Sequence, residues 1–309
     1  MAKTFVSVVL CALLAGFPSL ASAQSFEGIG IRAQGMAGAF VAVADDATAS
    51  WWNPAGLATS ASLADLIVEA GQGGHIGVAM GFPSLGLSYY RLDISPLQPS
   101  GSTGAGDSSR QDLGATGAGL PVSGSTAYQQ FGATMGQSIG DHLVVATTLK
   151  LVHVLSDLKG GLDVGTMASF GPLRVGVTVR DVTAGTFESD GETFELARRA
   201  RAGVAWLAPS GGRIDRLTLA FDADLTTAPI DGRDERNVAA GAEAWMLGRR
   251  LGVRGGMGAA FSDDPTGGGL FGAFGVSVSP LKMVTIGGAV TRGPSTERNR
   301  WGFDLRLTF

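Results

Sequence analysis

The sequence has very few of the residues that build disulfide frameworks, thiol sites or histidine-based metal sites. Its 309 residues include a single cysteine, Cys11, and three histidines. Because Cys11 lies in a predicted signal peptide, we expect the mature protein to have no thiol and no disulfide. His75, His142 and His153 do not follow the spacing of a histidine metal motif, so neither a metal ion nor another cofactor is expected.

Charged residues and long apolar runs are also scarce. Charged side chains make up 16% of the sequence and the formal net charge is −4, without a basic run. Nucleic acid is therefore not an expected partner. After residue 23 no apolar run reaches the roughly 20 residues of a transmembrane helix. Yet the mean hydropathy is slightly positive, which suits a barrel whose strands each show lipid one apolar face.

Residues 1–23 have the composition of a secretory signal peptide. Lys3 supplies the positive charge near the start, and an apolar core runs from Phe5 to Phe17. The small residues Ala21, Ser22 and Ala23 form a typical cleavage site, so we expect cleavage before Gln24. An uncleaved membrane anchor is the alternative, but the apolar core is shorter than a spanning helix.

Fourteen later segments have the length or the alternation of membrane strands. In one of them Leu173 and Val175 alternate with Arg174 and Gly176, and this period of two is typical of a strand with one apolar and one polar face. The last segment, 301–309, alternates in the same way. The predicted strands are 64–71, 74–81, 84–92, 127–137, 141–154, 164–170, 173–182, 195–207, 214–224, 235–247, 251–259, 268–278, 281–291 and 301–309.

The connections between these segments alternate in length. If both termini lie in the periplasm, the even-numbered strands end on the periplasmic side. The connections that follow them have six residues or fewer. Most odd-numbered strands end in longer loops, at 93–126, 155–163, 183–194, 225–234, 260–267 and 292–300. Outer-membrane barrels sort their turns and loops in this way. We therefore predict an all-β fold, a transmembrane antiparallel β-barrel of about 14 strands over residues 64–309.

The polar faces of the predicted strands would line the barrel interior. Charges there need water or opposite charges beside them, so a lumen filled by ion pairs and an open polar channel both fit. A barrel of this width is not filled by its own side chains, so something else must occupy the lumen. The candidate lumen charges are Lys150, Arg174, Arg180, Arg199, Arg201, Asp222, Asp224, Glu243, Arg254, Asp304 and Arg306.

Residues 24–63 do not follow the strand pattern and are rich in small side chains. A helical turn is expected to stop before Pro54, because the residue before proline avoids helical geometry. Gly56 would permit a close approach of backbone. We predict that this segment is a hatch that plugs the lumen, with Asn53, Pro54, Ala55 and Gly56 as its turn. Phe40, Trp51 and Trp52 would anchor the hatch against the wall or contact a ligand.

Residues 35–58, GMAGAFVAVADDATASWWNPAGLA, resemble the N-terminal signature of the FadL/TodX superfamily of outer-membrane transport proteins. PorV/PorQ-type barrels share a very similar stretch. The resemblance implies a hatch in the lumen and a hydrophobic pocket. Long-chain fatty acids or aromatic hydrocarbons would cross this pocket and leave sideways into the bilayer. The terminal Phe309 resembles the signal by which the assembly machinery recognises outer-membrane barrels.

One departure from the fatty-acid transporters favours the PorV/PorQ-like branch. The loop at 93–126 is rich in glycine, serine and threonine. The loops that bind hydrophobic ligands in the family are longer and more apolar. Members of that branch serve protein secretion or surface attachment. This role is the alternative to transport for the present chain.

A catalytic function is not expected. Gly136-Gln137-Ser138-Ile139-Gly140 matches the G-x-S-x-G serine motif, but that motif needs a strand–turn–helix context and here it joins two predicted strands.

The preferred function is passive uptake of small hydrophobic molecules across the outer membrane of a Gram-negative-type bacterium, because its lipopolysaccharide leaflet blocks apolar solutes. Two arginines on one predicted strand, Arg199 and Arg201, could contact a ligand carboxylate.

Overall fold

The computed structural model describes residues 28–59, 64–72, 74–94, 126–154, 157–183, 186–189, 192–208, 211–230, 233–263, 268–293 and 299–309. The predicted signal peptide and most of the loop 93–126 lie outside the described residues. In the described part of the chain, no helix is both long enough and apolar enough to cross a membrane.

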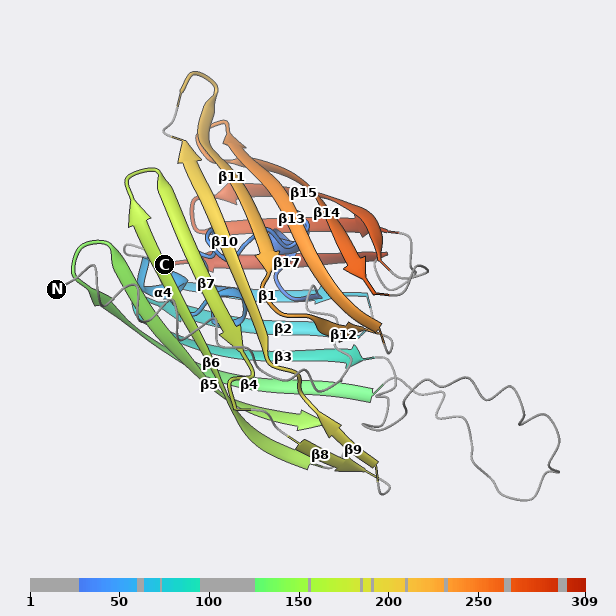
Figure 1. Cartoon of the computed structure of the whole chain (residues 1–309). Helices are drawn as coiled ribbons and strands as arrows, with labels where there is room; N and C mark the ends of the chain where they lie inside the picture. Colours follow the sequence, from blue (N-terminus) through green and yellow to red (C-terminus); the bar gives the residue numbers. More distant parts are fainter. Residues whose placement is uncertain are drawn as a thin grey trace.

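Fourteen antiparallel strands form a closed barrel (Figure 1). Wall strands that follow one another in sequence pair with each other, and the first wall strand, β1, pairs with the last, β17. A further pairing, of β11 with β13, closes the ring. The wall strands are β1 (Asp65–Gly71), β2 (His75–Phe82), β3 (Leu85–Ile94), β4 (Thr126–Ile139), β5 (Leu143–Val154), β6 (Asp157–Phe170), β7 (Leu173–Arg180), β10 (Arg199–Ala208), β11 (Ile214–Asp224), β13 (Arg233–Met246), β14 (Leu251–Ser262), β15 (Gly269–Leu281), β16 (Val284–Arg292) and β17 (Arg300–Thr308).

Each predicted strand overlaps one wall strand, but the predicted loop 155–163 is wrong. β6 begins at Asp157, and its residues Gly160 and Gly161 pair with Leu151 and Lys150 of β5. In the sequence the two glycines resemble a turn. In the barrel, a Cβ at Gly161 would meet the side chain of Lys150 at 2.9 Å. The glycine therefore makes room for a buried lysine, and pairing with β5 overrides the local preference.

Two other predicted loops contain short strands. β8 (Thr186–Ser189) and β9 (Glu192–Glu195) form a hairpin between β7 and β10, and β12 (Ala228–Ile230) pairs with the start of β13. All three belong to the end of the barrel that carries the longer connections. We call this the long-loop end, and the opposite end, with the tight turns, the short-turn end.

The outer face of the wall is apolar, as the alternation predicts. Exposed fractions reach 59% for Leu149, 53% for Phe131 and 61% for Phe303. Their sequence neighbours, such as Lys150 and Gly132, face the interior and are buried. Large apolar side chains that surround a closed barrel would be unfavourable in water and favourable in hydrocarbon.

Residues 28–59 lie inside the barrel, and we call them the inner segment (Figure 1). It contains α2 (Ile31–Gln34), α3 (Ala49–Trp52) and α4 (Gly56–Thr59). α2 packs against β15, β16 and β17, whereas α4 packs against β3, β4 and β5. The segment starts beside Leu92 and Arg300 at the long-loop end and ends near the turn between β2 and β3, so it passes through the interior from one end to the other.

Candidate functional site

The turn of the inner segment is fastened to the wall by one asparagine. The side-chain amide of Asn53 donates to the carbonyl oxygens of Val41, at 2.9 Å, and of Thr166 in β6, at 3.0 Å. Its Oδ1 accepts the backbone N–H of Ala55 at 3.2 Å. A Cβ at Gly56 would overlap the carbonyl oxygen of Ala44, so only glycine fits that position.

A wall aspartate holds the middle of the inner segment. Asp222 of β11 accepts the backbone N–H groups of Phe40 and Val41, both at 2.8 Å. Arg201 of β10 lies 3.6 Å from Asp222 and 3.4 Å from Asp224. Both of these carboxylates already balance the charge of Arg201, so the structure does not leave this arginine open for a ligand carboxylate.

The largest ionic cluster joins Arg32 of α2 to the wall. Glu243 of β13 accepts two hydrogen bonds from the Arg32 guanidinium, at 2.8 and 2.6 Å. Arg32 also pairs with Asp45 and Asp46, and Arg254 of β14 lies 3.3 Å from Glu243. The alternation of the strands predicts that Glu243 and Arg254 face the interior. It does not indicate Arg32, because an irregular segment has no period from which the direction of a side chain can be predicted.

The pKa of Asp45 illustrates how strongly this cluster is coupled. Burial alone would raise the pKa of this carboxyl, but the guanidinium groups of Arg32, Arg216 and Arg174 hold it well below the ordinary value. Arg216 makes the ion pair at 2.6 Å. Asp45 therefore carries its negative charge throughout the physiological pH range.

Other predicted lumen charges also have partners inside the barrel. Lys150 lies 2.6 Å from Asp163 and 2.8 Å from Asp181, and Arg180 lies 3.6 Å from Asp163. The two aspartates were missed because Asp163 fell in the wrongly predicted loop and Asp181 at the end of a strand. Arg306 pairs with Asp65 at 2.8 Å. Arg199 and Asp304 are also directed inward. These pairs favour a lumen filled by ion pairs over an open polar channel.

Glu69 is a further wall residue that contacts the inner segment but was not among the predicted lumen charges. Its carboxylate accepts the backbone N–H groups of Gly30, at 3.0 Å, and Ile31, at 3.2 Å, where α2 begins. His75 Nε2 lies 2.9 Å from the same carboxylate. Irregular alternation in the early strands hid Glu69 from the pattern analysis.

Aromatic side chains gather around Trp51 in the half of the barrel nearer the long-loop end. The Trp51 ring meets the rings of Tyr90 and Tyr128 edge to face, at centroid distances of 5.4 and 6.5 Å. The Arg180 guanidinium lies 3.5 Å from the Trp51 ring centroid, in cation–π geometry. Phe187 of β8 belongs to the same buried apolar cluster, which brings a long-loop residue into contact with the interior. We call Trp51, Tyr90, Tyr128 and Arg180 the Trp51 cluster.

The other two predicted aromatic anchors pack within the inner segment. The rings of Phe40 and Trp52 meet edge to face at a centroid distance of 6.1 Å. The indole N–H of Trp52 donates to the carbonyl oxygen of Ile29 at 2.9 Å. Both side chains are completely buried. They join distant parts of the inner segment to one another, and the guanidinium of the wall residue Arg201 lies 5.8 Å from the Trp52 ring centroid.

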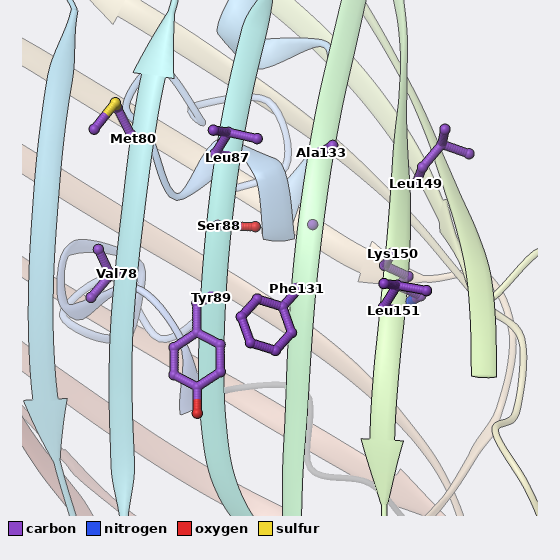
Figure 2. Close-up of a pocket in the computed structure, with 11 residues that line it drawn as sticks. Val78, Met80, Leu87, Ser88, Tyr89, Phe131, Ala133, Leu149, Lys150 and Leu151 are labelled. Atoms are coloured by element: carbon purple, nitrogen blue, oxygen red, sulfur yellow. The ribbon is translucent and has the colours of Figure 1, made fainter. Parts of the chain in front are cut away.

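The outer face carries an apolar groove of about 560 Å³ across β2, β3, β4 and β5 (Figure 2). Leu87, Tyr89, Phe131 and Leu149 surround it, and between them Ala133 provides only a methyl group. Tyr89 lines this groove, whereas the next residue, Tyr90, belongs to the Trp51 cluster. The groove and the Trp51 cluster therefore lie on opposite sides of the same part of the wall.

The short-turn end holds a larger cavity of about 860 Å³, and half of the residues that line it are charged. Asp45 and Arg216 line it, together with Arg174 of β7 and residues of the turns between wall strands. The aromatic Trp51 cluster thus lies toward the long-loop end, whereas this cavity lies at the short-turn end.

Neither a metal centre nor a serine nucleophile emerges from this geometry. Among the residues that the structure describes, no group of three or more histidines, cysteines or carboxylates is placed to hold a metal ion. The motif at 136–140 ends β4 and enters the turn to β5, so it lacks the helix that a nucleophile elbow requires. At the C-terminus, Phe309 is exposed and donates its backbone N–H to Ala64 at 2.9 Å.

Comparison with known sequences gives one partial match. The family model described as "F plasmid transfer operon, TraF, protein" matches residues 155–224, which run from the start of β6 to the end of β11. No curated protein matches the chain.

Comparison with solved structures gives matches along almost the whole chain. The CymD monoaromatic hydrocarbon channel is 11% identical with a TM-score of 0.59, and the match covers 93% of this chain and 98% of CymD. The toluene transporter TbuX of Ralstonia pickettii is 13% identical with a TM-score of 0.56, covering 92% and 98%. A FadL homologue of Pseudomonas aeruginosa is 11% identical with a TM-score of 0.56, covering 95% and 98%. The chain therefore has the fold of the FadL/TodX outer-membrane transport proteins.

Proposed function

We propose that this chain is an outer-membrane barrel for the passive uptake of small hydrophobic molecules of the hydrocarbon or long-chain fatty acid type. The observation that carries the proposal is the fold, which the chain shares over more than nine-tenths of its length with a monoaromatic hydrocarbon channel and a toluene transporter. The apolar outer face supports a position in the membrane. Lipid and lipopolysaccharide would cover that face.

The proposed entry lies at the Trp51 cluster. Aromatic faces and edges bind apolar and aromatic molecules well, and this cluster lies toward the end of the barrel that would face the outside. Phe187 belongs to the same buried apolar core as Trp51, so a movement of the β8–β9 hairpin would open that core toward the long-loop end.

The proposed exit lies at the apolar groove on the outer face. A molecule that leaves the Trp51 cluster beside Tyr90 would reach hydrocarbon by passing only the thickness of the wall, because Tyr89 already lines the groove (Figure 2). Sideways exit avoids the charged cavity at the short-turn end, where an apolar molecule would displace water from ionic groups. Here the inner segment would serve as the predicted hatch, closing the axial path.

Uptake of radiolabelled toluene tests this function. We expect cells that produce the protein to accumulate toluene several times faster than the matched deletion strain. Equal rates in the two strains would reject hydrocarbon uptake. Recognition of Phe309 by the assembly machinery stays a prediction, which deletion of Phe309 and measurement of folded barrel in the membrane would test.

The exit is tested separately by filling the groove. Ala133→Trp places a large ring in the groove from the lipid side and should lower toluene uptake at least fivefold. Ala223→Trp is the matched control, because Ala223 lies on the outer face of β11, away from the groove. If both variants take up toluene like the unmodified protein, the exit is elsewhere while uptake itself stands.

A further inference from the structure

The cavity at the short-turn end has more positive charge than its own carboxylates can balance. Eight arginine and lysine side chains and four carboxylates line it. Glu243 and Asp65 pair with lining arginines from outside the lining and reduce the excess to two positive charges. Three of the eight cations, Arg249, Arg250 and Lys282, are exposed residues of the turns. The excess positive charge therefore faces solvent at the short-turn end, where it attracts anions.

Arg174 is a half-buried cation of this lining that has an unsatisfied hydrogen-bond donor. Its Nη1 is buried and has no hydrogen-bond partner among the described residues. The nearby carboxylate of Asp45 already pairs with Arg32 and Arg216. A buried N–H group of a guanidinium that donates to nothing is unfavourable, and a bound carboxylate would accept from it.

The apolar residues of the lining indicate which kind of anion the cavity suits. Ile67, Leu207 and Trp245 contribute apolar surface to the same cavity. A volume of about 860 Å³ lies within the range of small-molecule sites and is far larger than an inorganic ion requires. The cavity therefore suits an anion with an apolar body.

We propose that the short-turn cavity binds small organic carboxylates with an apolar body, with Arg174 as the residue that receives the carboxylate. The guanidinium presents two parallel N–H groups to the two carboxylate oxygens. The apolar body lies against Leu207 and Trp245. This site is separate from the Trp51 cluster and the outer groove, and its existence does not depend on hydrocarbon uptake.

Equilibrium binding of benzoate to the purified full-length barrel in detergent tests the proposal, with benzamide as the neutral probe of the same shape. We expect benzoate to bind at least tenfold more tightly than benzamide. Arg174→Gln should remove that difference, because it removes the positive charge and the paired guanidinium N–H donors. Asp45 keeps Arg32 and Arg216 as its partners. Arg213→Gln, in the turn between β10 and β11 and outside the cavity lining, is the matched control and should bind benzoate within twofold of the unmodified protein.

A second variant keeps the proposal testable if Arg174→Gln does not fold. Leu207→Trp fills the cavity while Arg174 is retained, and it should weaken benzoate at least tenfold. The proposal is overturned if benzoate binds no better than benzamide, if Arg174→Gln or Leu207→Trp binds benzoate like the unmodified protein, or if Arg213→Gln weakens it equally. Toluene uptake without this benzoate preference would reject the anion site alone, whereas benzoate binding without toluene uptake would reject only the transport function.

Discussion

The two faces of the barrel wall are made by the same strands but are stabilised in different ways. On the outer face, Leu149, Phe131 and Phe303 are largely exposed and need only an apolar surrounding. On the inner face, Glu243 and Asp222 each hold particular groups of the inner segment at hydrogen-bond distance. An outer residue can therefore be exchanged for another apolar one, whereas an inner residue is fixed by its partners.

The largest effect is expected on the inner face, from Glu243→Ala. The change leaves the buried guanidinium groups of Arg32 and Arg254 without their shared carboxylate. Breaking a buried ion pair costs about 3–5 kcal/mol, and we expect the upper part of this range because two arginines lose a partner. Urea unfolding of the detergent-folded barrel, followed by its heat-dependent gel shift, measures the loss. Asp215→Ala removes a half-buried carboxylate at the short-turn end that accepts one hydrogen bond, from the backbone N–H of Arg249, and should cost only about 1 kcal/mol.

Two tryptophans allow the same change to be made on each face. Trp51→Ala removes an interior ring from its contacts with Tyr90 and Tyr128, and should cost near the lower end of the range of about 3–5 kcal/mol. It should also slow toluene uptake. Trp206→Ala, on the outer face of β10 where Trp206 is 43% exposed, should destabilise the barrel much less. Equal losses in urea unfolding would contradict the difference between the faces.

How far each face could be predicted follows from this difference. The alternation of Leu173, Arg174 and Val175 already indicates which side chains face out, because the period of two is local to the strand. Arg32, which donates two hydrogen bonds to Glu243, lies 211 residues away in an irregular segment, and no local pattern indicates this pairing. Gly160 and Gly161 show the same limit, since only pairing with β5 makes them part of a strand.

A smaller effect is expected from the turn of the inner segment. Asn53→Ala removes the side-chain donor to the buried carbonyl oxygen of Val41 and to the half-buried carbonyl oxygen of Thr166. An unsatisfied buried group costs about 1–3 kcal/mol, measured again by urea unfolding. Asn53→Asp would keep the size of the side chain but lose the donors, so it should be at least as damaging. A neutral result for both variants would mean that these two hydrogen bonds contribute nothing to holding the turn.

The smallest effect is expected from mild acid. The pKa of Asp45 lies well below its ordinary value in the folded protein, so its contribution to stability is present above the unfolded-state pKa of about 4 and is lost only as pH falls through the lower folded value. The difference in unfolding free energy between the unmodified protein and Asp45→Asn should therefore stay constant between about pH 7 and about pH 5. A difference that shrinks within this window would show that Asp45 takes up a proton there.

The most direct test of the two-faced wall is quenching of tryptophan fluorescence by brominated lipid. Two proteins would be compared in bilayers, one that keeps only Trp206 and one that keeps only Trp52, with phenylalanine at the other tryptophan positions. We predict strong quenching of Trp206, which faces outward, and little quenching of Trp52, which is completely buried in the inner segment. Equal quenching of the two, or none of Trp206, would contradict the claim that lipid covers the outer face while the inner segment lies inside the barrel.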